Sequence, residues 1–321
     1  MSGTNTHARV AGVRDRTWIV AVAAGMWGLD GLLRKPLATT LDAATVVLWE
    51  HLIAVILLCW LVPRAVRVYV HCSLRDQVAI ALIGVGASAV ATALFTEAFA
   101  ISAKTNDFIT PVVLQKLQPL FAVTLAVLIL GERLRPRFAM YAVPALIGAW
   151  LLSFADPFDV QVVAIKVSLL SLGAAVLWGA GTVLGRLVSP AVGPRDLTVL
   201  RYAWGLPAAF AVALQTHAEL APGWHNLFGL TLLALIPGIA ALSLYYFGLR
   251  ATAASRATFA ELAFPGTAAV VGVVFLNSHL SWSQWLGFGI IVVSITALGW
   301  NERTRHRAVE DPMAEAAVVG S

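Results

Sequence analysis

The chain has 321 residues, of which 59% are hydrophobic and only 12% are charged, and its mean hydropathy is +0.82. Soluble domains carry about 25% charged residues, so this composition excludes an ordinary soluble globular protein. The formal net charge of +5 would fit a nucleic-acid partner, but the basic residues are spread over short connections between apolar segments, and no nucleic-acid partner is expected.

Ten apolar segments of similar length follow one another between a polar tail, residues 1–16, and a second tail over 301–321. A helix needs about 20 predominantly apolar residues to cross a bilayer. The sequence therefore predicts an all-α integral membrane protein with ten transmembrane helices, and a disordered second tail. The predicted spans are 17–33, 43–63, 77–100, 107–130, 138–154, 166–188, 197–216, 227–249, 257–276 and 282–300.

The basic residues predict the orientation of these spans. With a cytoplasmic amino terminus, sixteen arginines fall in cytoplasmic connections or tails, whereas Arg34, Lys35, Lys104 and Lys166 fall outside. This asymmetry is the positive-inside bias, and it predicts a multi-pass protein of the plasma (inner) membrane with both termini in the cytoplasm. The sixteen are Arg9, Arg14, Arg16, Arg64, Arg67, Arg75, Arg133, Arg135, Arg137, Arg186, Arg195, Arg250, Arg256, Arg303, Arg305 and Arg307.

The chain contains an internal repeat. Ala23–Gly28 reads AAGMWG, and Ala174–Gly179 repeats the pattern as AAVLWG. Five spans in each half is an odd number, so the second half must enter the membrane from the opposite side. Inverted repeats of this kind are the usual construction of secondary transporters. We expect two five-helix repeats over 17–153 and 166–300, joined by an outer linker over 154–165.

A second match between the halves places two prolines at equivalent positions. Residues 118–134 align without gaps on 264–280, which superposes Pro119 on Pro265. A proline in the middle of a span frees backbone carbonyls, and membranes tolerate free carbonyls only away from lipid. The fourth helix of each half is therefore expected to break at its proline and to face the interior of the bundle.

These features together resemble the EamA family of the drug/metabolite transporter superfamily. The resemblance lies in Trp27-Gly28 and its repeat, in the proline-centred fourth span that ends at Leu130–Leu134 (LGERL), and in Leu200–Tyr202 (LRY) at the start of the seventh span. It implies an alternating-access carrier of small organic solutes, such as amino acids or related metabolites. Leu48–His51 (LWEH) departs from the family, which often has an arginine there, and the second half lacks the Gly-Glu-Arg ending.

Four ionisable residues inside the spans have matching depths. Glu50 and Lys116 lie at similar depth from the outer surface, and Arg201 and Glu261 at similar depth from the inner surface. We expect two symmetry-related ion pairs, Glu50–Lys116 and Arg201–Glu261. Each pair is either a structural staple between helices or a functional element, since ionisable residues in a membrane are costly. Arg201–Glu261 would then be a gate, and Glu50–Lys116 would bind cargo.

Two acidic residues are candidates for proton coupling. Glu50 could carry the proton beside a substrate held by Lys116. Glu97 is flanked at helical spacing by apolar residues, a setting that favours the neutral acid. The alternative for Glu97 is a neutral carboxyl that is hydrogen-bonded to a neighbouring helix. His51, next to Glu50, could be a proton relay or a second hydrogen-bonding group.

Further polar and aromatic residues could line a substrate cavity. Gln115 and Gln118 share one helix ridge, and the alternative for them is hydrogen bonding between helices. Trp27 and Trp178 lie in mid-span beside a glycine, where they could stack on a ligand. Core packing is the alternative for each tryptophan, but symmetric positions favour the central site.

Other classes of protein fit the sequence less well. Neither a His-Glu-x-x-His nor a Gly-x-Ser-x-Gly string occurs, and a glycine-rich phosphate loop is also missing, so we expect no enzyme, no metal, no cofactor and no ATP-driven pump. A lipid flippase or a non-transporting scaffold of the same fold stays open, as does a homodimer. The expected partners are a small-molecule substrate and the lipid bilayer.

Overall fold

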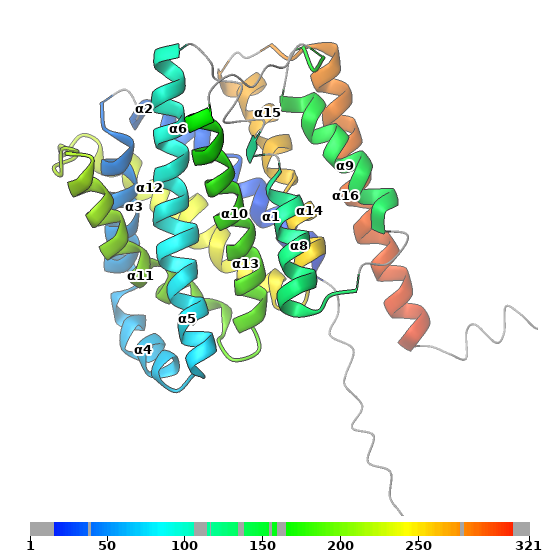
Figure 1. Cartoon of the computed structure of the whole chain (residues 1–321), viewed down its shortest axis with the longest axis horizontal. Coiled ribbons are helices and arrows are strands. Elements are labelled where there is room, and N and C mark those ends of the chain that lie inside the picture. Colours follow the sequence, from blue (N-terminus) through cyan, green and yellow to red (C-terminus); the bar gives the residue numbers. More distant parts are fainter. Residues whose placement is uncertain are drawn as a thin grey trace, which may run out of the picture.

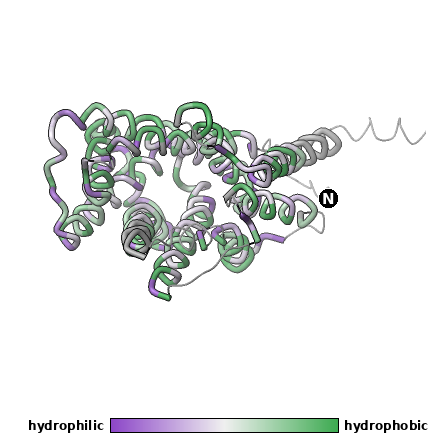
Figure 2. Tube along the Cα trace, turned by 90° about the horizontal axis from the view of Figure 1, so that it is seen from above, coloured by the Kyte–Doolittle hydropathy of each residue, from purple (hydrophilic) through white to green (hydrophobic). Residues whose placement is uncertain are grey.

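The computed structural model describes residues 16–37, 40–105, 114–115, 117–133, 138–153, 156–158, 165–276 and 279–310. All regular elements within these ranges are helical (Figure 1). Hydrophobic residues make up most of the helical tube, as Figure 2 shows from above. The helices of the first half are α1 (Thr17–Trp27), α2 (Asp30–Leu37), α3 (Ala43–Leu57), η1 (Cys59–Leu61), α4 (Val62–Val70), α5 (Leu74–Leu82), η2 (Ile83–Val90), α6 (Ala91–Thr105), α8 (Gln118–Leu130) and α9 (Phe138–Ser153).

In the second half the first two spans are unbroken helices, whereas their counterparts in the first half are interrupted. The last helix of the second half runs ten residues beyond the predicted end at 300, so nearly three helical turns replace the start of the expected disordered tail. The elements are α10 (Ile165–Val188), α11 (Pro194–Gln215), α12 (Leu227–Leu233), η3 (Ala234–Ala240), α13 (Ala241–Leu249), α14 (Ala254–Ala260), α15 (Ala263–Leu276) and α16 (Trp282–Glu310).

Length and composition of the described helices confirm only part of the predicted set of membrane spans. Within the described ranges, five helical stretches are long and apolar enough to cross a membrane, and a sixth is the pair Ala43–Leu57 and Cys59–Val70, which bends by 59°. Gln118–Leu130, Ala139–Leu152 and Trp282–Ala297 are shorter apolar helices. The all-helical class is confirmed, whereas the count of ten is not, because several predicted spans break or contain residues outside the described ranges.

Irregular helix marks equivalent places in the two halves. The third span contains the π-helical segment η2, and the eighth contains η3. The spacing between Ile83 and Ala234, which begin these segments, equals the spacing between Ala23 and Ala174 in the sequence repeat. A π-helical turn widens the hydrogen-bonded ring and occurs frequently at functional sites. The repeat seen in sequence therefore extends to the backbone.

The arginine-rich connections lie together at one end of the bundle. The Arg16 guanidinium donates to the carbonyl of Phe247 at 3.2 Å, and Arg186 donates to the carbonyl of Arg250. Arg64 forms an ion pair with Asp196 at 3.4 Å. These contacts join the ends of spans that the positive-inside bias assigns to one face.

Candidate functional site

A cavity of about 510 Å³ lies between the two halves of the chain. Helices from both repeats contribute its walls, including α1, α3 and α8 from the first half and α10, α11 and α14 from the second. Most of the residues singled out from the sequence line it. These are Trp27, Glu50, Gln115, Gln118, Pro119, Trp178, Arg201, Glu261 and Pro265. Lys116, the other cavity candidate, lies outside the described residues.

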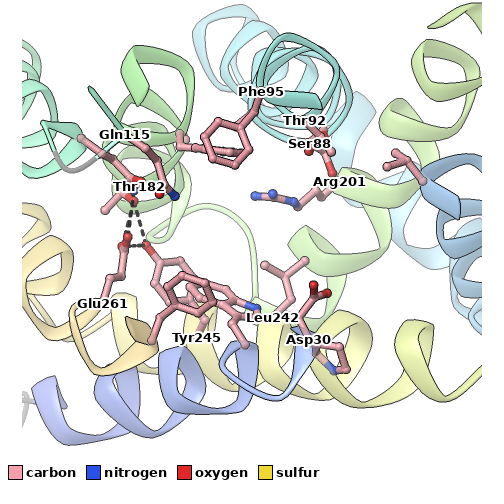
Figure 3. Close-up of a pocket in the computed structure, with 18 of the residues that line it drawn as sticks. Asp30, Ser88, Thr92, Phe95, Gln115, Thr182, Arg201, Leu242, Tyr245 and Glu261 are labelled. Carbon is pink, nitrogen blue, oxygen red and sulfur yellow. Dashed lines mark hydrogen bonds between the residues drawn. The ribbon is translucent and has the colours of Figure 1, made fainter. Parts of the chain in front are cut away.

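Two aromatic pairs form opposite walls of this cavity, and each joins the two halves. The ring of Trp27 on α1 lies 5.1 Å from that of Tyr245 on α13, in a tilted arrangement. The ring of Trp178 on α10 lies 5.2 Å from that of Phe95 on α6, edge to face. In Figure 3, Phe95 and Tyr245 lie on opposite sides of the pocket. The tryptophan of the first helix in each half thus contacts an aromatic ring from the third span of the other half.

The glycine after each tryptophan explains why the Trp-Gly pattern repeats. A Cβ atom added to Gly28 would lie 2.6 Å from the Cβ of Thr267 on α15. One added to Gly179 would lie 3.0 Å from the backbone nitrogen of Ala122 on α8. Both neighbours belong to the proline-bearing fourth helix of the opposite half. Glycine therefore allows this helix to approach closely, while the preceding tryptophan faces the cavity.

Glu261 lies at one end of the cavity, in the break between α14 and α15. Its Oε1 accepts hydrogen bonds from the hydroxyls of Tyr245 at 2.7 Å and Thr182 at 2.9 Å, as the dashed lines in Figure 3 show. Its Oε2 accepts from the Gln118 side-chain amide at 3.1 Å. Gln118 belongs to the first half and Glu261 to the second, so the carboxylate connects the halves through neutral donors.

Glu50 forms an ion pair with Arg34, whereas its predicted partner Lys116 lies outside the described residues, so the predicted pair stays a prediction. The Arg34 guanidinium contacts Glu50 Oε2 at 3.1 Å and Asp30 at 2.7 Å, forming a cluster of two acids and one base. The side chain of Glu50 is only 17% exposed. The sequence prediction overlooked Arg34 because it lies near a predicted span end, where an arginine is usually solvated. The chain breaks after Trp27, and the new helix α2, which begins at Asp30, places Arg34 beside α3.

The predicted pair Arg201–Glu261 does not form among the described residues. Arg201 donates instead to the hydroxyl of Tyr246 at 3.2 Å, and Glu261 accepts from the three neutral donors. Both residues line the cavity, but Figure 3 shows Glu261 on one side of it, apart from the Arg201 side chain, which points into the centre. Depth along two helices could not show this separation, because depth carries no information about lateral distance.

His51 makes two hydrogen bonds inside the bundle and is buried. Its Nδ1 lies 2.8 Å from the Val47 carbonyl oxygen, which can only accept, so Nδ1 carries the proton. Its Nε2 lies 2.8 Å from the Ser88 hydroxyl on η2. In the neutral tautomer the hydroxyl therefore donates to Nε2. The second of the two sequence alternatives, a hydrogen-bonding group, describes His51 in this state.

Glu97 does not lie in the apolar setting that the sequence predicted. Its side chain is 51% exposed, and its carboxylate lies 3.7 Å from the ammonium group of Lys166 at the start of α10. Half of this side chain is therefore exposed, and its carboxylate has a charged partner. Glu97 is absent from the cavity lining of the described residues.

Several residues that shape the cavity were not identified from the sequence. Thr182, Tyr245 and Phe95 look like ordinary core residues in a linear reading, and only their contacts across the two halves give them a place in the site. Ser88 carried a weak signal, since the surrounding run Ile83–Val90 is rich in glycine and alanine, which suits close helix packing in membranes.

Comparisons with known proteins give the family. The profile of the EamA-like transporter family matches residues 17–154 and 165–300, one match for each repeat. The riboflavin transporter ImpX of Fusobacterium nucleatum is 30% identical over 292 residues, which cover 86% of this chain and 95% of that protein. The uncharacterized transporter YwfM of Bacillus subtilis is 28% identical over 194 residues, 59% of this chain and 64% of that protein.

A solved structure, described as the crystal structure of a protein, superposes with a TM-score of 0.71 at 18% identity. It covers 90% of this chain and 98% of the other, and it supports the fold alone. The family and the names of the relatives point to a transporter rather than an enzyme. The chain belongs to the EamA-like transporter family, as the order of its sequence motifs predicted.

Proposed function

We propose that this protein is a secondary transporter that moves a small organic solute across the inner membrane by alternating access. The ten predicted spans would form two inverted repeats, with both termini in the cytoplasm. The observation that carries the proposal is the cavity between the halves, framed by the cross-half pairs Trp27–Tyr245 and Trp178–Phe95. Carriers with inverted repeats bind their cargo at such a repeat interface.

The solute that the site suits best is a flat heterocycle of the flavin type. Aromatic rings on two opposite walls favour a planar π-system, because the faces and edges of aromatic rings attract one another. The volume of about 510 Å³ falls within the range of roughly 300–1,000 Å³ for sites that hold drug-sized ligands. The relative named as a riboflavin transporter supports the same class. Amino acids, the expectation from sequence, are the second class to test.

Proton coupling is part of the proposal, and Glu261 is the carboxyl that suits it best. Its three partners are neutral donors, so protonating it leaves no buried cation unpaired. Protonating Glu50 would remove one of the two carboxylates that hold Arg34. Gln118 connects Glu261 to the other half, so a change of charge there would act on the contact that must rearrange during transport.

Flux into proteoliposomes tests the proposal. We expect radiolabelled riboflavin to accumulate, to respond to an imposed pH gradient, and to fall at least tenfold in Trp178→Ala. Trp204→Ala is the matched control, because Trp204 packs against Tyr69 at a ring distance of 5.9 Å and does not line the cavity among the described residues. Flux that ignores the gradient would remove proton coupling.

The remaining outcomes separate the other classes. Transport of amino acids without riboflavin would refute the flavin class and keep the carrier. Absence of flux for both solutes, with lipid scrambling in the same vesicles, would favour a flippase. Absence of both activities would favour a scaffold and overturn the proposal.

A further inference from the structure

The two ends of the cavity have opposite hydrogen-bonding character. Arg201 projects from α11 into the open centre of the pocket (Figure 3). A guanidinium has five N–H donors. Among the described residues, one of these donors bonds to Tyr246 at 3.2 Å, and no other acceptor engages this side chain. Arg201 therefore presents unused donors to the cavity.

The groups that line the cavity do not take up these donors. Glu50 is one of them, and its Oε2 is held by Arg34 at 3.1 Å. The hydroxyls of Ser88 and Thr92 also line the cavity, but neither accepts a hydrogen bond from Arg201 among the described residues. An acceptor group on the solute is what would satisfy Arg201.

The opposite end of the cavity presents an acceptor. A carboxylate offers about four lone-pair positions, and three of those on Glu261 are occupied by Tyr245, Thr182 and Gln118. Oε2 accepts only from Gln118 among the described residues, so it has capacity for one further donor. A hydroxyl or N–H group of the solute fits there, whereas an anionic group would meet a negative charge.

We propose that Arg201 and Glu261 set the orientation and the charge selectivity of the solute. The carbonyl-rich edge of a planar heterocycle bonds to Arg201, its flat body lies between the aromatic walls, and a donor-bearing side chain, such as the hydroxyls of a ribityl group, bonds to Glu261. An anionic group at the end of that side chain is excluded. This inference rests on the proposed function and names the chemistry that its site selects.

Three flavins distinguish the contacts with Arg201 from the contacts with Glu261. Riboflavin carries the dione edge and the hydroxyl side chain, lumiflavin carries the dione edge with a methyl group in place of that side chain, and FMN adds a phosphate at the end of it. Binding to the purified full-length protein in detergent is measured by equilibrium dialysis. We expect wild-type protein to bind FMN at least tenfold more weakly than riboflavin, because the phosphate approaches the Glu261 carboxylate.

Two substitutions give different patterns over these ligands. Arg201→Gln should weaken riboflavin and lumiflavin equally, by roughly tenfold to a hundredfold, since both lose a charge-assisted hydrogen bond. Glu261→Gln should leave lumiflavin unchanged within about threefold and reduce the discrimination against FMN to less than about threefold. A loss of structure in Glu261→Gln would weaken the binding of all three flavins, whereas the proposed role changes only the affinity for FMN relative to riboflavin.

A matched variant controls for a purely structural role. Tyr246→Phe removes the protein partner of Arg201 but keeps the guanidinium. It should retain the wild-type order of the three flavins. If Tyr246→Phe reproduces Arg201→Gln, or if Glu261→Gln affects all three flavins equally, the proposed orientation is wrong while flavin binding stands. If the wild-type protein binds none of the three, the flavin class itself fails, and the orientation with it.

Discussion

The Glu132 carboxylate of the first half caps the first turn of α14 in the second half through Ser255. It accepts the Ser255 backbone N–H at 3.1 Å and the Ser255 hydroxyl at 2.6 Å, and it also accepts the N–H of Ala254 at 2.7 Å. Glu132 follows α8, which carries Gln118, and α14 ends at Ala260, directly before Glu261. One carboxylate therefore ties together the two helices that meet again at the cavity.

The sequence repeat does not keep the capping carboxylate. The gapless alignment of the halves places Ser278 opposite Glu132, so a carboxylate stands at only one of the two equivalent positions. The arginine-rich end of the bundle, where Glu132 lies, thus has a link between the halves that the sequence does not repeat.

Glu132→Ala should destabilise the protein by about 1–3 kcal/mol, because it leaves two backbone N–H groups and one hydroxyl of α14 without their acceptor. The measurement is thermal unfolding of detergent-purified protein. Arg133→Gln, at the neighbouring exposed position of the same motif, is the control and should unfold within about 0.5 kcal/mol of wild type. Equal loss in both variants would contradict the capping role.

Gly28→Val and Gly179→Val should each destabilise the bundle by about 1–3 kcal/mol through overpacking, since even a Cβ atom comes within 2.6 Å of Thr267 or 3.0 Å of Ala122. Gly289→Val is the control, because nothing lies within 4 Å of a Cβ built there. Unfolding temperatures in detergent give the comparison. A neutral Gly28→Val would mean that α1 and α15 do not pack closely.

Ser88→Ala should cost about 1–3 kcal/mol, because the buried Nε2 of His51 loses its donor. Thr124→Ala is a matched loss of a hydroxyl, since the Thr124 hydroxyl bonds to the carbonyl of Leu120 in its own helix at an exposed site. That control should stay within about 0.5 kcal/mol of wild type. The measurement is thermal unfolding. A similar loss of stability in the two variants would argue against the hydrogen bond between Ser88 and His51.

Glu50→Gln and Glu97→Gln test the two acidic candidates of the sequence against each other. Glu50→Gln should lower riboflavin flux and destabilise the protein by about 1–3 kcal/mol, because Arg34 loses a carboxylate partner at a largely enclosed site. Glu97→Gln should leave flux unchanged and stability within about 0.5 kcal/mol, since its pair with Lys166 is exposed. A flux defect in Glu97→Gln alone would restore Glu97 as the coupling residue.

The sequence was sufficient to predict the class of the protein and its two repeats, because the lipid bilayer restricts which residues a membrane-spanning helix can contain. A run of apolar residues is needed wherever a helix crosses hydrocarbon, and arginine counts report sidedness without any tertiary information. The Trp-Gly repeat likewise placed Trp27 and Trp178 in mid-span before their contacts were known. These signals depend on each residue's own position along the chain.

The partners of the charged residues were decided only by the tertiary structure. Glu50 pairs with Arg34 because α1 breaks at Gly28, and Glu261 bonds to neutral donors because α14 ends there. A sequence gives depth along each helix, but the rotation of a helix about its axis and the distance to its neighbours arise from packing between the halves. Such lateral relationships determine which polar groups meet, and hence what the cavity can hold.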